Sequence, residues 1–168
     1  EVLVRTAGMT YVVSQNANSV EPGAVLWEVS IIIAKLLDEN ALDSSTLADR
    51  KVLELGAGQG LTSCVLATLG CKRVVCTEEE ITPPPKTVER NADVLKAKPE
   101  VVAYSWGVGE PPIKADVIVC GDCLYNKDHA HLLVRGLLDC ASSSTSVYLC
   151  GAVGEDAYRA FLAEAPRY

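Results

Sequence analysis

A short apolar strand runs directly into a glycine-rich turn between residues 51 and 60. These residues read Lys-Val-Leu-Glu-Leu-Gly-Ala-Gly-Gln-Gly, and residues 61–69 that follow are typical of an apolar helix. Glycine has no Cβ atom and tolerates positive φ, so Gly56, Gly58 and Gly60 allow a tight turn that approaches a ligand closely. The helix that follows offers free N–H groups at its N-terminus. This order of elements predicts a Rossmann-like nucleotide-binding unit.

The spacing of the glycines separates this turn from a dinucleotide-binding fingerprint. That fingerprint reads G-x-G-x-x-G, whereas the turn here reads G-x-G-x-G and follows Glu54 inside the strand. A carboxylate is poorly placed beside a pyrophosphate, but it suits a ligand that carries an ammonium group. The pattern therefore predicts S-adenosylmethionine as the ligand. Glu54 is expected near its amino group, directly or through water, with the glycine backbone beneath its methionine and ribose.

A second acidic residue follows the next predicted strand. Residues 73–77 read as a buried strand, and Glu78 stands at its C-terminal end. It lies about twenty residues after the first glycine, where ribose hydroxyls are usually bound. Glu78 is therefore the ribose candidate. The alternative is that Glu78, with Glu79 and Glu80, belongs to a solvated loop.

Strands and helices alternate along the chain, which favours a parallel sheet covered on both faces. We expect one α/β domain over residues 1–168, with a Rossmann-like, doubly wound, mostly parallel sheet and a small N-terminal hairpin. The expected elements are a hairpin (2–4 and 10–14), a helix (26–38), a polar turn (43–46), a strand (52–55), a helix (61–69), a strand (73–77), a helix entered through three prolines (86–95), two strands (101–105 and 115–120), a helix (129–138), a strand (146–150) and a helix (155–165).

Composition bounds the class of protein. The chain has 168 residues, of which 49% are hydrophobic, and a net charge of −7. No apolar run approaches the ~20 residues that cross a bilayer, so we expect no membrane segment and a location in the cytoplasm or the nucleus. The acidic balance argues against nucleic acid as the main partner and suits a basic protein segment. Because the sequence begins at Glu1 rather than methionine, we expect a portion of a longer protein.

Seven cysteines lie mostly in apolar strand or helix contexts. Buried thiols in a reducing compartment are the expected state. Cys120 and Cys123 have the C-x-x-C spacing of a redox or zinc pair, which is the alternative interpretation. His129 and His131 lie in a different segment and do not complete a second ligand pair, so we expect no metal.

The remaining candidate residues follow two further strands. In open α/β sheets, ligands bind outside the C-terminal ends of the strands. Trp106 follows the third predicted strand of the sheet, and Gly121, Asp122 and Tyr125 follow the fourth. Trp106 is expected to contact the adenine, with a surface-capping aromatic as the alternative. Asp122 and Tyr125 have the alternative role of capping the helix that follows.

Taken together, these motifs resemble those of the seven-β-strand, Rossmann-like methyltransferases, and within them the family 16 lysine methyltransferases. The resemblance covers roughly residues 10 to 140. It is carried by Gly23-Ala-Val-Leu-Trp27-Glu, Val52-Leu-Glu-Leu-Gly-Ala-Gly-Gln-Gly60, Thr77-Glu78, Asn91, Ser105-Trp106-Gly107 and Ala115-Asp-Val-Ile-Val-Cys-Gly-Asp-Cys-Leu-Tyr125.

The resemblance implies S-adenosyl-L-methionine as the cofactor and assigns residues to it. Trp27 would border the methionine end of the cofactor. Gly56, Ala57 and Gly58 would line it, and Glu78 would bind the ribose.

The resemblance also implies transfer of the methyl group to the ε-amine of a protein lysine. Trp106 and Gly121 would flank the adenine, and Asp122 and Tyr125 would form the D-x-x-Y edge of the acceptor pocket. Holding a neutral amine beside the methyl supplies much of the rate by orientation alone, so no strong general base is required. Asp122 would bind and orient the amine, while Tyr125 would desolvate it.

The chain departs from the family pattern in three places. Glu78 stands where the family more often has aspartate, and the segment from Asn91 to Trp106 is compact. The closing β-hairpin expected after Cys150 is absent from these 168 residues, so the C-terminal hairpin is expected to be truncated.

Three alternatives to lysine methylation remain open. They are a small-molecule or protein-histidine methyltransferase, a catalytically weak pseudo-methyltransferase that acts as a binding module, and an amino-methylating nucleic-acid enzyme. Amino-methylating nucleic-acid enzymes have an N-P-P-Y element, and in this chain Cys123 and Leu124 stand in place of its two prolines.

Overall fold

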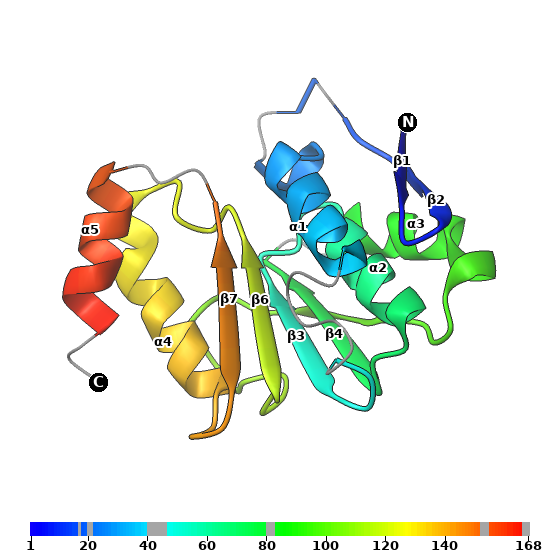
Figure 1. Cartoon of the computed structure of the whole chain (residues 1–168). Coiled ribbons are helices and arrows are strands. Elements are labelled where there is room, and N and C mark those ends of the chain that lie inside the picture. Colours follow the sequence, from blue (N-terminus) through cyan, green and yellow to red (C-terminus); the bar gives the residue numbers. More distant parts are fainter. Residues whose placement is uncertain (17, 20–21, 40–46, 80–82, 152–154, 166–168) are drawn as a thin grey trace.

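A parallel sheet with the strand order β5-β4-β3-β6-β7 forms the centre of the molecule (Figure 1). The computed structural model describes residues 1–16, 18–19, 22–39, 47–79, 83–151 and 155–165. Within this part, the strands are β1 Val2–Thr6, β2 Met9–Val13, β3 Lys51–Leu55, β4 Arg73–Glu78, β5 Glu100–Ala103, β6 Val117–Gly121 and β7 Ser146–Cys150. The helices are η1 Pro22–Ala24, α1 Glu28–Asp38, α2 Leu61–Leu69, α3 Pro83–Arg90, η3 Ala92–Val94, η4 Lys127–His129, α4 Ala130–Cys140 and α5 Glu155–Glu164. The predicted Rossmann-like sheet and the antiparallel hairpin β1-β2 are confirmed.

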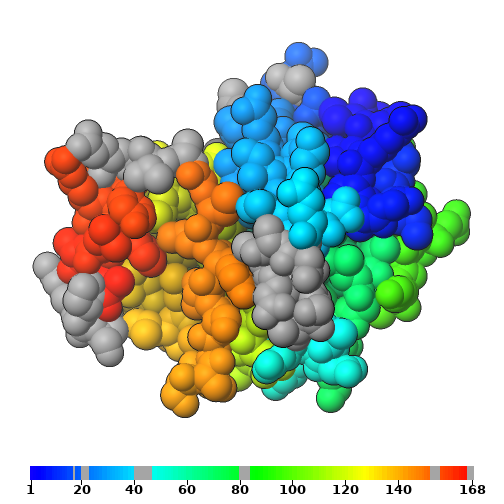
Figure 2. Space-filling view, viewed as in Figure 1, coloured from blue at the N-terminus to red at the C-terminus, as the bar shows by residue number. Residues whose placement is uncertain are grey.

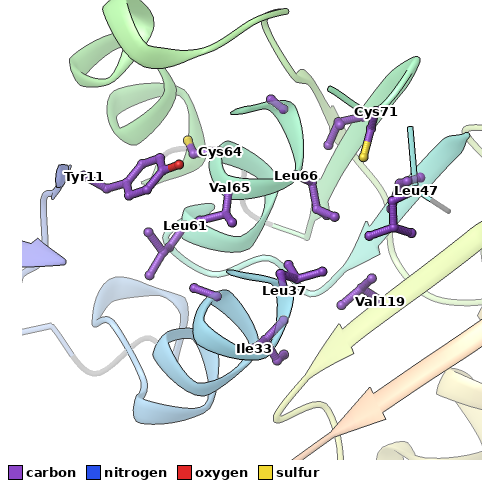
Figure 3. Close-up of a cluster of buried hydrophobic side chains, with 14 of the residues drawn as sticks. Tyr11, Ile33, Leu37, Leu47, Leu61, Cys64, Val65, Leu66, Cys71 and Val119 are labelled. Atoms are coloured by element: carbon purple, nitrogen blue, oxygen red, sulfur yellow. The ribbon is translucent and has the colours of Figure 1, made fainter. Parts of the chain in front are cut away.

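The sheet separates two hydrophobic clusters, because successive side chains of a strand point to opposite faces. In β3, Val52 packs with α1, α2 and the hairpin, whereas Leu53 and Leu55 pack with α4 and α5. Figure 3 shows the first cluster, where Tyr11 of β2 and Leu37 of α1 lie against the side chains of α2. All five side chains are buried, and each contributes on the order of 2 kcal/mol through removal from water.

The hairpin is attached to the domain through the side chain of Asn91. Its Oδ1 accepts a hydrogen bond from Val12 N, and its Nδ2 donates to Val12 O, both at 2.8 Å. Nδ2 also donates to Thr87 O of α3. Asn91 therefore supplies the pairing that an adjacent strand would give β2. In Figure 2 the hairpin (dark blue) and α1 (light blue) form one continuous surface.

Two predicted elements have different boundaries in the structure. The helix predicted over residues 86–95 begins at Pro83 and ends at Arg90, where Asn91 turns its amide toward the hairpin. The strand predicted over residues 101–105 ends at Ala103, because its partner β4 ends at Glu78 and offers no further ladder.

The strand predicted to begin at residue 115 begins at Val117. The N–H of Ala115 donates to Cys140 O at the end of α4, so this residue is tied to the helix rather than to the sheet. The turn predicted over residues 43–46 lies outside the described residues. No helix in the described part of the chain is long and apolar enough to cross a membrane.

Candidate functional site

The strand order reverses between β3 and β6. From β3 the chain builds outward through β4 to β5, and it then returns to add β6 and β7 on the other side. The C-terminal ends of parallel strands at such a reversal form a crevice that binds ligands in open α/β sheets. The residues that the sequence singled out follow β3, β4, β5 and β6 at this edge.

The glycines of the turn after β3 have positive φ, a conformation that is strained for residues with a Cβ atom. Gly56, Gly58 and Gly60 have φ values of 65°, 53° and 77°. A Cβ atom added at Gly56 would lie 3.1 Å from both Trp106 Cζ2 and Cys123 Sγ. The turn is therefore packed closely against the ends of β5 and β6, as expected for one common crevice.

Hydrogen bonds connect the turn to β4 and to η1. The N–H of Ala57 donates to Thr77 O at 2.9 Å, which joins the turn to β4. Gln59 Nε2 donates to Gly23 O at 2.6 Å, which holds η1 beside the turn. Among the described residues, a Cβ atom at Gly58 would meet only Gly23 Cα, at 4.0 Å, so the described part of the chain leaves space on this side of the turn. Sequence reasoning did not identify Gln59, whose only signal was its place inside the turn.

Glu78 lies at the end of β4 with its carboxylate beneath the glycine turn. Its Oε2 accepts a hydrogen bond of 2.7 Å from Gly58 N, and its Oε1 accepts one of 3.0 Å from Glu79 N. The alternative of a solvated loop does not describe Glu78, because the carboxylate is engaged by the turn. A carboxylate accepts several hydrogen bonds at once, so Glu78 can bind ribose hydroxyls and still contact Gly58.

Glu54 is buried behind the turn and is only 3% exposed. Its Oε2 accepts hydrogen bonds from the N–H and the hydroxyl of Ser63 in the first turn of α2. These donors stabilise the charged form, but burial outweighs them and raises the pKa of Glu54 to about 7. Glu54 thus satisfies a helix-terminal N–H that lacks a partner within the helix. Its predicted contact with the amino group of the cofactor stays a prediction.

The end of β6 carries the candidate acceptor residues. Asp122 has φ 55°, an uncommon conformation for a residue other than glycine, and its N–H donates to Cys150 O at 2.7 Å. It does not cap the following helix, because that role belongs to Asn126, whose side chain accepts from Asp128 N. Gly121 lies against α1, where an added Cβ would be 3.0 Å from Ile33 Cδ1.

Two aromatic side chains near these ends are largely exposed. Tyr125 is 58% exposed, and its ring meets that of His129 edge-on at a centroid distance of 5.8 Å. Trp27 is 49% exposed and immediately precedes α1. The pKa of Tyr125 is raised by partial burial and by the negative charges of Glu78 and Glu79. The acceptor edge therefore lies in a negative potential.

All seven cysteines are free thiols. Cys123 Sγ donates to Leu55 O at 3.3 Å. The pKa of Cys123 is raised, first by its hydrogen bond with Cys120 and then by burial. A raised pKa disfavours the thiolate that metal binding requires. Among the described residues, no three His, Cys, Asp or Glu side chains gather as a metal site would need.

Comparison with known proteins identifies related sequences. A sequence model of the lysine methyltransferase family matches residues 9–167. The chain is 30% identical over 128 residues to the protein N-terminal and lysine N-methyltransferase EFM7 of Debaryomyces hansenii, covering 66% of this chain and 50% of that protein. It is 33% identical over 126 residues to the protein-lysine methyltransferase METTL21E of Bos taurus, covering 69% and 41%. The chain spans about half the length of the curated relatives it matches.

Solved structures show the same fold at low sequence identity. The RsmC 16S rRNA methyltransferase of T. thermophilus, in complex with AdoMet and guanosine, superposes with a TM-score of 0.63 at 23% identity, covering 88% of this chain and 40% of that chain. A protein from Streptococcus mutans gives a TM-score of 0.67 at 15% identity, covering 97% of this chain and 45% of that chain.

Proposed function

The chain belongs to the lysine methyltransferase family, and from this membership we propose that it transfers a methyl group from S-adenosylmethionine to the ε-amine of a lysine in a protein. The observation that carries the proposal is the meeting of the glycine turn, Glu78 and the Asp122–Tyr125 element at one edge of the sheet. Of the curated relatives named above, METTL21E is a protein-lysine methyltransferase and EFM7 is a protein N-terminal and lysine N-methyltransferase, which supports the same activity.

The residues present fit the cofactor. The space beside Gly58 would give a ligand access to the backbone of the turn, since Gly23 is the one described residue within 4 Å of an added Cβ. The carboxylate of Glu78 already lies against that backbone and suits ribose hydroxyls. The ring of Trp106 reaches Gly56 from the β5 side and offers an adenine ring a flat apolar surface.

When bound, S-adenosylmethionine supplies an electrophilic methyl group. The task of the protein is to hold a neutral amine beside it, since orientation can supply much of the acceleration. The carboxylate of Asp122 would bind and orient the amine, although its charge raises the pKa of a nearby lysine. The exposed rings of Tyr125 and Trp27 would desolvate the amine and so favour its neutral form, and the proton would leave to water.

Charge at the crevice supports a lysine within a basic segment. Glu78, Glu79 and Asp122 lie at or beside the ends of β4 and β6, and the whole chain has a net charge of −7. Electrostatic attraction would steer a cationic segment toward this edge and would weaken with added salt. Free thiols are typical of a reducing compartment, which supports our proposal that the protein acts in the cytoplasm or the nucleus.

Two measurements test the proposed function. Calorimetry should show binding of S-adenosylmethionine and S-adenosylhomocysteine and no binding of nicotinamide dinucleotides. Radiolabelled methyl transfer into a lysate, resolved by mass spectrometry, should place the label on lysine. Label on histidine or on a small molecule would assign the activity to another acceptor class, and binding without transfer would indicate a binding module.

A further inference from the structure

The loop after β5 and the helix α4 fit together through two glycines. A Cβ atom added at Gly136 would lie 3.0 Å from Trp106 Cβ and 3.3 Å from its Cα. A Cβ atom added at Gly107 would lie 2.7 Å from Arg135 Cβ. Each segment therefore contributes one large side chain and one glycine, and each large side chain lies over the glycine of the other segment.

Gly136 stands in the interior of α4, where glycine is unfavourable. Glycine gains more freedom on unfolding than alanine does, so it lowers helix stability at such a position. The residue is buried, and the three atoms nearest to an added Cβ, at 3.0–3.4 Å, all belong to Trp106. Close approach of the loop to the helix is therefore the structural reason for glycine here.

The loop that carries Trp106 is a tight unit. The N–H of Gly107 donates to Tyr104 Oη at 3.3 Å, and the N–H of Val108 donates to Ser105 O at 3.0 Å. Tyr104 is itself buried in the cluster that includes α4. A displacement of the loop from the helix would therefore move the ring of Trp106 with it.

The far end of that ring contacts the glycine turn. Trp106 Cζ2 lies 3.1 Å from the position of a Cβ atom at Gly56. We propose that Gly136 is a positioning residue, which seats Trp106 on α4 so that the indole ring forms a wall of the cofactor crevice. This inference rests on the proposed function, because it assumes that the crevice binds S-adenosylmethionine.

The test substitutes alanine for Gly136 and measures the solvent accessibility of the Trp106 ring and the affinity for S-adenosylmethionine. Accessibility of Trp106 is followed by acrylamide quenching in a Trp27→Phe background, where Trp106 is the remaining tryptophan. Affinity for S-adenosylmethionine is measured by calorimetry in the otherwise unchanged chain. Leu138→Ala serves as the control within α4, since Leu138 is 42% exposed. Gly109→Ala serves as the control within the loop for the strain of alanine at positive φ, since Gly109 and Gly107 have φ values of 78° and 69° and no described atom lies within 4 Å of the Cβ added at Gly109.

We expect Gly136→Ala to change the quenching of Trp106 and to weaken cofactor binding about five-fold or more, because small misplacements of a binding group are costly. The melting temperature should fall, because crowding of Trp106 at a buried contact outweighs the better helix propensity of alanine. The two controls should leave quenching and affinity unchanged. Unchanged quenching or unchanged affinity in Gly136→Ala would overturn the inference.

A second variant covers the case in which Gly136→Ala does not fold. Gly107→Ala crowds Arg135 Cβ at the same interface from the loop side and should weaken binding more than Gly109→Ala does, whereas equal affinities in these two variants would overturn the inference. Failure of the unchanged chain to bind S-adenosylmethionine would contradict the proposed function instead. The quenching comparison needs no ligand, so it separates the two failures.

Discussion

The carboxylate of Glu78 accepts a hydrogen bond of 2.7 Å from the backbone N–H of Gly58, which joins the end of β4 to the glycine turn after β3. The two residues are 20 positions apart in the sequence, and both are candidates for binding the cofactor. In the fold they form one surface. Ligand binding and the geometry of the turn are therefore coupled through a single side chain.

Replacing Glu78 by alanine should weaken cofactor binding. The substitution removes the acceptor for ribose hydroxyls and for Gly58 N–H, at a cost of about 1–3 kcal/mol. Calorimetry with S-adenosylhomocysteine should show an affinity about five-fold lower or worse. Glu79→Ala is the matched control, because it removes the neighbouring carboxylate. An unchanged dissociation constant in folded Glu78→Ala would show that Glu78 does not bind the ribose.

Replacing Asp122 by asparagine should separate transfer from cofactor binding. Asparagine tolerates the positive φ of this position, so the backbone is kept while the charge is lost. Cofactor affinity should stay within a few-fold, whereas methyl transfer should fall on the order of a hundred-fold through misplacement of the amine. Near-wild-type turnover would remove Asp122 from the acceptor site. Loss of both properties would assign the loop to the adenosine pocket and leave Tyr125 and Trp27 as acceptor residues.

Stability should depend on pH through Glu54. Its pKa is about 7 in the folded chain, above its ordinary value of 4.5, so the native state binds more protons between these values. The contribution of Glu54 to stability is present below pH 4.5 and is lost as the pH rises through 7. Glu54→Gln keeps an acceptor for Ser63 and removes this titration.

Urea unfolding of both proteins from pH 4.5 to pH 8 measures the effect. The free energy of unfolding of Glu54→Gln, relative to the unchanged chain, should rise by about 1–3 kcal/mol across this interval. Taking the difference cancels the titration of other groups. Parallel pH profiles of the two proteins would show that the pKa of Glu54 is not raised by folding.

Removing the amide of Asn91 should destabilise the fold. Asn91→Ala leaves the N–H and C=O of Val12 without their present partners and empties a buried position. We expect a loss of about 2–4 kcal/mol in the free energy of unfolding. Hydrogen exchange of the Val12 amide should also accelerate. Asn126→Ala, at an exposed helix cap, is the control and should cost about 1 kcal/mol. Equal losses in the two variants would contradict the anchoring role.

Local patterns were sufficient for most of the elements and for the edge of the sheet that carries the site. Residues 61–69 were predicted and observed as a helix, because an apolar run follows a glycine turn and ends at Gly70. The acidic residue at the end of β4 was predicted from the strand that precedes it. These features depend on neighbours in the sequence, so their signals are present in the amino-acid order.

The sequence by itself therefore determined the order of strands and helices, the glycine turn and the candidate residues at the strand ends, since backbone preference and hydrophobic alternation act over a few residues. Contacts between distant segments determined the rest. Helix α3 ends at Arg90 because Asn91 bonds to a hairpin 79 residues away, and Glu54 is buried against Ser63. Trp106 reaches the glycine turn because Gly136 lets it approach α4. Such contacts depend on which surfaces the packed sheet brings together, and no local pattern contains that information.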